Sequence, residues 1–201
     1  MASIHLPNIL ISIPRNPVYV TDLLHFEPSP TPSCRVALGL PLTLGILSGS
    51  STASVVRGQW YKNLYAPPGR PPRQVFPIVW PILYLSMGYA SHLTVKALDA
   101  SVSPNTRDSL TLGIASYYAQ LSMNFAWSPL FFNAKQIGLA LIDSALMAGT
   151  TYYMTKLLDE PTQSKTTYFL LPYCAWLTFA MYLNGGIWWL NRGRRDLSKE
   201  D

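Results

Sequence analysis

The stretch Q120-L-S-M-N124-F-A-W127-S-P-L-F-F132 decides the fold of this chain. It ends an apolar run that begins near Leu110, yet it carries an amide side chain, Asn124, and an indole N–H, Trp127. Polar groups in a membrane segment are costly, and they usually face a protein interior or a cavity. The stretch therefore predicts a helix that packs among other helices and turns these two side chains away from lipid.

The composition favours a membrane protein. Hydrophobic residues make up 49% of the 201 residues and charged residues only 12%, against about 25% charged residues in an ordinary soluble domain. Five apolar segments approach the roughly 20 residues that a spanning helix needs, namely Val36–Val56, Val75–Leu98, Leu110–Phe132, Gln136–Leu158 and Thr166–Leu190. The predicted fold class is all-α, a polytopic membrane protein built as a five-transmembrane-helix bundle.

The chain divides into three parts. Residues 1–35 hold six prolines and no periodic apolar face, and proline at that density forbids a continuous helix. We expect a disordered tail there, and neither a cleaved signal peptide nor an amphipathic presequence. The five-helix domain follows over residues 36–192, and residues 193–201 form a charged C-terminal tail.

The basic residues predict how the bundle is oriented. Nine Lys and Arg residues fall in the first loop, the third loop and the C-terminal tail, and six fall on the opposite side. Because cytoplasmic loops collect Lys and Arg, we place the first loop and the C-terminus in the cytosol. The excess positive charge then faces anionic lipid, and no nucleic-acid partner is expected.

The sequence shows none of the standard catalytic or metal-binding motifs. The two cysteines, Cys34 and Cys174, lie far apart, and the three histidines, His5, His25 and His92, are scattered. Neither a metal site nor a catalytic triad is suggested, and no Gly-rich phosphate loop occurs. The prediction is a protein that is not an enzyme, with no catalytic residues and no required cofactor.

Aromatic and amide side chains share single helical faces at one depth of the predicted bundle, its cytosolic half. They are Phe76, Trp80 and Tyr84, then Asn124, Trp127 and Phe131, and then Trp176 and Asn184. Ala180 and Leu183 share the face of Trp176 and Asn184, and the small residues Ser48 and Gly49 of segment 36–56 lie at the same depth. Taken singly, each aromatic is as well explained as a core or interfacial residue, and each amide as a contact between helices. Taken together, they predict a cytosol-proximal cavity for a hydrophobic ligand.

Several of these stretches resemble the translocator protein family, also called tryptophan-rich sensory proteins or peripheral-type benzodiazepine receptors. The resemblance rests on W60-Y-K-N-L64, P71-P-R-Q-V-F-P-I-V-W80-P-I-L-Y84, the stretch 120–132, A140-L-I-D143 and L171-P-Y-C-A-W176-L-T-F-A-M-Y-L183-N184. It implies a five-helix membrane protein, often a homodimer, that binds a sterol or a porphyrin (a haem-type tetrapyrrole). It also implies a mitochondrial outer membrane location, with the endoplasmic reticulum as the alternative.

Carried over by position, the family's pocket falls on Trp80, Tyr84, Asn124, Trp127, Phe131, Asp143, Leu146, Trp176, Ala180 and Leu183. In the first loop, Arg70 and Arg73 are predicted to belong to a proline-stiffened lid that meets a ligand's carboxylates. The alternative is that both arginines bind phospholipid head groups.

Asp143 leaves two other functions open. An acidic residue inside a predicted span is by default functional, so a small proton- or ion-coupled transporter that uses Asp143 is one alternative. A structural membrane adaptor, which would show no saturable lipophilic ligand, is the other.

Overall fold

The computed structural model describes residue 52 and residues 54–193, and this part of the chain contains helices and no strand. Four long helices dominate it: α4 (Phe76–Ala100), α5 (Pro104–Ser128), α6 (Ile137–Asp159) and α7 (Lys165–Asn191). They match the last four predicted segments. Most of the first predicted helix, 36–56, lies outside the described residues, as do Ser48, Gly49, the tail 1–35 and residues 194–201. The all-α prediction is confirmed, and the count of five spanning helices stays a prediction.

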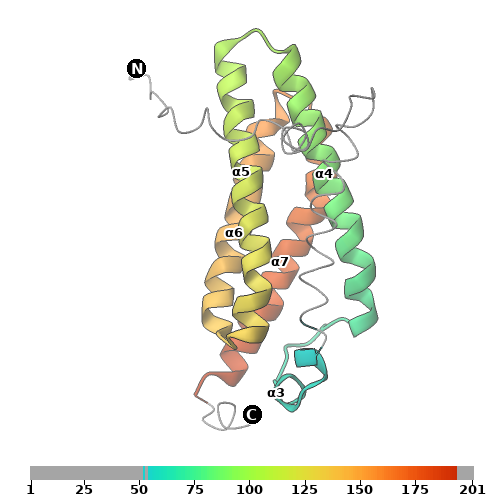
Figure 1. Ribbon diagram of the computed structural model, residues 1–201, viewed down its shortest axis with the longest axis vertical. Coiled ribbons are helices and arrows are strands. Elements are labelled where there is room, and N and C mark those ends of the chain that lie inside the picture. Colours follow the sequence, from blue (N-terminus) through green and yellow to red (C-terminus); the bar gives the residue numbers. More distant parts are fainter. Residues whose placement is uncertain (1–51, 53, 194–201) are drawn as a thin grey trace, which may run out of the picture.

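The four helices run side by side along the longest axis of the molecule (Figure 1). In chain order each packs on the next, and α4 also packs on α7, so that they form a closed ring. The turn between α4 and α5 lies at the upper end in Figure 1, and the short helix α3 (Gln59–Lys62) lies at the lower end, near the end of α7. The loop from α3 to the 3₁₀ turn η2 (Arg73–Val75) therefore sits beside the last turns of α7.

Helix α5 begins six residues before the predicted Leu110, at Pro104. Proline suits the first turn of a helix, where its missing N–H has no partner in any case. Arg107 fixes this early start, because its guanidinium donates to the carbonyl oxygens of Leu98 at 2.7 Å and Ser101 at 2.9 Å. The polar first turn of α5 is thus fastened to the end of α4.

The end of α5 is altered by Pro129. Proline has no N–H with which to continue the α-helical ladder, and from this residue the chain forms the π turn η3 (Pro129–Asn133). The amide of Ala134 donates to the carbonyl of Pro129 at 2.9 Å. Lys135, in the left-handed region at φ 54°, then turns the chain into α6.

The interior holds both apolar and polar side chains. One core cluster fills the bundle from Leu83 on α4 to Leu177 on α7, and Gln120, Asn124 and Asn184 are buried with it. Large apolar side chains are instead exposed on the outward faces of α4, α6 and α7, among them Ile78, Ile82, Leu139, Ile142, Leu146 and Tyr168. None of the helices in the described residues is both long enough and apolar enough to count as a candidate membrane span.

The loop after α3 is fastened to α7. The side chain of Asn191 accepts from the amide of Tyr65 at 3.1 Å and donates to the carbonyl of the same residue at 2.8 Å. The hydroxyl of Tyr182 donates to the carbonyl of Pro68 at 3.1 Å. A side chain at Gly186 would place its Cβ 2.5 Å from Pro67, so only glycine allows this close approach.

Replacing Gly186 by alanine should therefore release the loop. We expect Gly186→Ala to raise the hydrogen–deuterium exchange of amides 64–70, because the added methyl pushes Pro67 away from α7. Gly149→Ala is the matched control, since nothing lies within 4 Å of a Cβ at that helical glycine. Unchanged exchange in Gly186→Ala would show that the loop does not depend on this contact.

Candidate functional site

Four predicted aromatic side chains come together between α4 and α7. The ring of Trp80 stacks on Tyr84 with 5.4 Å between centroids, and it meets Trp176 edge-on at 6.4 Å. Phe76 also meets Trp176 edge-on, at 5.9 Å. Phe125 of α5 extends the stack beyond Tyr84 at 6.4 Å. We call Phe76, Trp80, Tyr84 and Trp176 the α4–α7 aromatic cluster.

Next to this cluster, toward the end of the bundle where α4 turns into α5, the amides form a buried network that joins three helices. The hydroxyl of Tyr84 donates to Oδ1 of Asn124 at 2.7 Å, and Nδ2 of Asn124 donates to the hydroxyl of Tyr173 at 3.0 Å. Tyr173 in turn donates to Oε1 of Gln120 at 2.8 Å. The sulfur of Met147 on α6 lies 3.6 Å from both Asn124 and Tyr173. Asn124 thus faces other helices, which is why the sequence tolerates an amide there.

Trp127 and Phe131 lie in a different cluster. Their rings stack at 4.9 Å, and Phe131 meets Trp60 of α3 edge-on at 6.1 Å. This second cluster also contains Leu64 and Ile187, and it lies under the loop that follows α3. The predicted set is therefore divided between two places in the bundle.

The remaining predicted residues take varied positions on α6 and α7. Leu183 and Asn184 are buried, and Asn184 donates to the hydroxyl of Ser144 at 3.3 Å. Ala180 is half-buried. Leu146, in contrast, is 59% exposed on the outward face of α6, away from both aromatic clusters. Contact of each of these residues with a ligand stays a prediction.

Three predicted residues carry a buried polar atom that has no hydrogen-bond partner in the structure. They are Nε1 of Trp176, Oδ1 of Asn184 and Oδ2 of Asp143. Buried polar groups normally find a partner, so each of these atoms has a hydrogen-bonding capacity that the described contacts leave unused. Trp176 and Asn184 lie on one face of α7, two turns apart. One donor and one acceptor are thus aligned along α7, which contributes Trp176 to the aromatic cluster.

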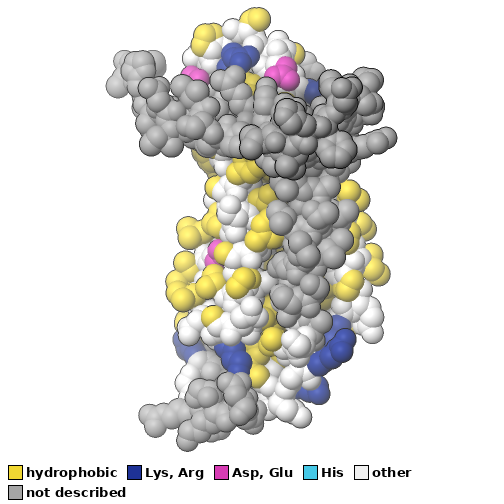
Figure 2. All heavy atoms as spheres, viewed as in Figure 1, with side chains coloured by type: hydrophobic (Ala, Val, Ile, Leu, Met, Phe, Trp, Pro, Cys, Tyr) yellow, Lys and Arg dark blue, Asp and Glu magenta, His cyan; other side chains and the backbone are white. Residues whose placement is uncertain are grey.

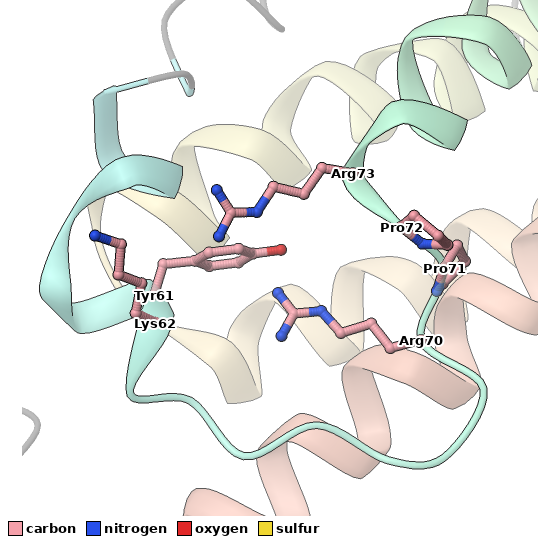
Figure 3. A pocket seen from close by; sticks show the side chains of 6 residues that line it. All are labelled: Tyr61, Lys62, Arg70, Pro71, Pro72 and Arg73. Atoms are coloured by element: carbon pink, nitrogen blue, oxygen red, sulfur yellow. The ribbon is translucent and has the colours of Figure 1, made fainter.

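Arg70 and Arg73 do not reach the α4–α7 aromatic cluster. They line a surface pocket of about 370 Å³ with Tyr61, Lys62, Pro71 and Pro72, and both guanidinium groups extend toward Tyr61 (Figure 3). The predicted lid loop exists as a segment fixed to α7, but the structure turns its two arginines toward α3.

Sequence reasoning missed Gln120, Tyr173 and Trp60. Gln120 lies four residues before Asn124 and Tyr173 three residues before Trp176, so helical spacing could have placed both beside predicted residues. Trp60 stands in the first loop, where no periodicity shows that it would pack against Phe131. In residues 54–193 no three His, Cys, Asp or Glu side chains gather as metal ligands.

Comparison with known proteins identifies the family. The profile of the TspO/MBR family matches residues 37–190. The translocator protein of Bos taurus is 37% identical over 162 residues, covering 79% of this chain and 92% of that protein. The translocator protein homolog of Schizosaccharomyces pombe is 41% identical over 133 residues, covering 65% and 77%, respectively. The tryptophan-rich protein TspO of Chlorobaculum tepidum is 31% identical over 156 residues, covering 78% and 94%.

The chain belongs to the TspO/MBR family. The resemblance seen in the sequence is confirmed, and with it the prediction of a membrane protein of the translocator and benzodiazepine-receptor type.

The buried amide network makes a direct prediction for this family member. Tyr173→Phe removes the hydroxyl that joins Asn124 to Gln120, so it should lower the free energy of unfolding by about 1–2 kcal/mol. Tyr153→Phe is the matched control, because Tyr153 is 53% exposed on α6. Denaturation in detergent measures both, and equal stability of the two variants would show that the network contributes nothing.

Proposed function

We propose that this chain binds a planar hydrophobic ligand, a porphyrin or a sterol, against the α4–α7 aromatic cluster of a membrane helix bundle. The observation that carries the proposal is Trp176, whose indole N–H is buried without a hydrogen-bond partner and whose ring meets Phe76 and Trp80 edge-on. The rings of Trp80 and Trp176 remain only partly buried. They offer aromatic area to a flat molecule, and the free N–H offers one polar contact that would fix its orientation.

The distribution of side chains supports a bilayer setting. Apolar side chains face outward along α4, α6 and α7, and the amides face inward. A bundle in lipid needs this arrangement, because a polar group exposed to hydrocarbon is costly. We propose that the four described helices and the segment 36–56 cross the membrane, with the C-terminus in the cytosol. The mitochondrial outer membrane is the proposed location.

Charge differs between the two ends of the bundle, which supports this orientation. In the described residues the lower end in Figure 2 carries Arg57, Lys62, Arg70, Arg73, Lys135 and Arg192, with no acidic residue in its loops. The upper end carries Lys96, Arg107, Lys156 and Lys165 together with Asp99, Asp108, Asp159 and Glu160. An excess of Lys and Arg is typical of cytoplasmic loops.

Removal of the Trp176 ring tests the proposed site. We expect Trp176→Ala to weaken protoporphyrin and a fluorescent sterol by about 1–3 kcal/mol each, because a pocket aromatic contributes mainly contact area. Trp176→Phe should recover part of the affinity, since it restores a ring without the N–H. Equilibrium titration of the full chain in lipid nanodiscs measures these affinities.

Trp189→Ala is the control on the same helix, because Trp189 is 58% exposed near the end of α7. It should leave both affinities unchanged. Equal losses in the Trp176 and Trp189 variants would mean that the ligand is not held by the aromatic cluster.

A coupled transporter remains the second candidate because of Asp143. One oxygen of this carboxylate is buried without a partner in α6, as a proton- or ion-carrying residue would be. Under the binding proposal, liposomes with the unmodified chain show no gradient-driven uptake, and Asp143→Asn changes no flux. Uptake that follows a pH gradient, is lost in Asp143→Asn and is kept in Asp108→Asn would favour the transporter.

A further inference from the structure

We propose that the surface pocket between α3 and η2 is a separate binding site for a phosphate group. Its lining includes three basic side chains, Lys62, Arg70 and Arg73, and the ring of Tyr61. In Figure 3 the two guanidinium groups extend toward this ring, and the side chain of Lys62 extends away from it. The pocket has a volume of about 370 Å³, within the range of small-molecule sites. This site is distinct from the α4–α7 aromatic cluster, which none of these side chains reaches.

The pocket concentrates positive charge, and among the described residues no acidic side chain lines it. No Asp or Glu occurs anywhere in residues 28–98. Basic side chains that line one pocket repel one another, and an anion between them would turn this repulsion into attraction. The charge of the pocket therefore selects an anion.

The ring of Tyr61 positions the guanidinium of Arg70. The guanidinium of Arg70 lies over this ring, 4.6 Å from its centroid, and Figure 3 shows the guanidinium of Arg73 extending toward the same ring from η2. A cation over an aromatic face gains about 0.5–1 kcal/mol at an exposed site. A guanidinium that lies over a ring can still donate hydrogen bonds, because its N–H donors lie in its own plane and remain available to an oxyanion.

The backbone of the pocket is also fixed before any ligand arrives. Pro71 and Pro72 form one wall, and proline restricts the chain and so lowers the entropy lost on binding. The preceding residues are fastened to α7 through Asn191, Tyr182 and Gly186, as described above. The loop that carries Arg70 and joins Lys62 of α3 to Arg73 of η2 is thus fixed in position, which is what a specific site requires and a flexible basic tail lacks.

Phosphate fits this set of donors better than a single carboxylate does. Two guanidinium groups pair with the oxygens of a phosphate through parallel N–H donors, and an ammonium adds a point charge. The phosphate belongs either to a lipid head group or to a free ion. The lipid source rests on the membrane placement proposed above, because η2 leads directly into α4 at the basic end of the bundle.

Lipid retention by the full chain tests the site. Native mass spectrometry of detergent-solubilised protein would compare phosphatidic acid with phosphatidylcholine, and inorganic phosphate would be titrated as the free competitor. We expect a preference for phosphatidic acid that falls about fivefold in each of Lys62→Gln, Arg70→Gln and Arg73→Gln, equivalent to ~1 kcal/mol per basic residue. Tyr61→Ala should lower it as well, and Tyr61→Phe should keep it.

Lys156→Gln is the matched control, since it removes one exposed positive charge at the opposite end of the bundle. It should leave the preference unchanged, and Trp176→Ala should too, which separates this site from the proposed hydrophobic site. Displacement of phosphatidic acid by millimolar inorganic phosphate would assign the site to the free ion, and resistance to it would assign the site to the lipid; either result supports a phosphate site.

Three outcomes would overturn the proposal. One is an equal loss in Lys156→Gln and Lys62→Gln, which would indicate net charge alone. Another is the absence of any preference for phosphatidic acid together with no binding of inorganic phosphate. The third is that the Arg70 and Arg73 variants lose affinity for protoporphyrin alone and keep the preference for phosphatidic acid. These arginines would then bind the carboxylates of the hydrophobic ligand, as a lid would.

Discussion

The hydrogen bonds among Tyr84, Asn124, Tyr173 and Gln120 are the constraint on which the rest of the bundle depends. They join α4, α5 and α7 at one level, with O···O and N···O distances of 2.7–3.0 Å. An apolar interior offers no substitute partner for an amide, so breaking any one of these bonds leaves a buried polar group unsatisfied. The network therefore fixes the rotation of each helix. Trp80 precedes Tyr84 by one turn and Trp176 follows Tyr173 by one turn, so the same bonds set the position of the aromatic cluster.

A second constraint acts at the basic end of the bundle. The π turn at Pro129 carries Phe131 toward Trp60, and α7 holds the loop after α3 through Asn191 and the bare backbone at Gly186. This end therefore has its own packed cluster and its own rigid loop. The bundle therefore has two proposed sites that differ in chemistry. The aromatic rings between α4 and α7 suit a hydrophobic ligand, and the basic side chains of the loop suit an anion.

The sequence predicted the ends of α4, α6 and α7 to within about two residues. Each of these helices packs along the whole bundle, so its apolar segment in the sequence is as long as the helix itself. It missed the start of α5, which depends on hydrogen bonds from Arg107 and carries no apolar signal. It predicted that Asn124 faces inward, but its partner Tyr173 comes from a helix 49 residues away and no local pattern indicates such a pairing. Helical periodicity, depth and the family resemblance all group Trp127 and Phe131 with Trp80. The structure instead places them with Trp60 in a second cluster at the basic end, because of the π turn at Pro129 and the position of α3, neither of which has a periodic signal in the sequence.

The central claim is that a hydrophobic ligand binds where the indole N–H of Trp176 is buried and unpartnered. The most direct measurement is the indole ¹⁵N–¹H NMR spectrum of the full chain in nanodiscs, with the six Trp signals assigned by substitution. Titration with a sterol should shift the Trp176 signal and that of its neighbour Trp80, and it should leave that of Trp189 in place. A ligand-dependent shift at Trp189 with no change at Trp176 would contradict the account.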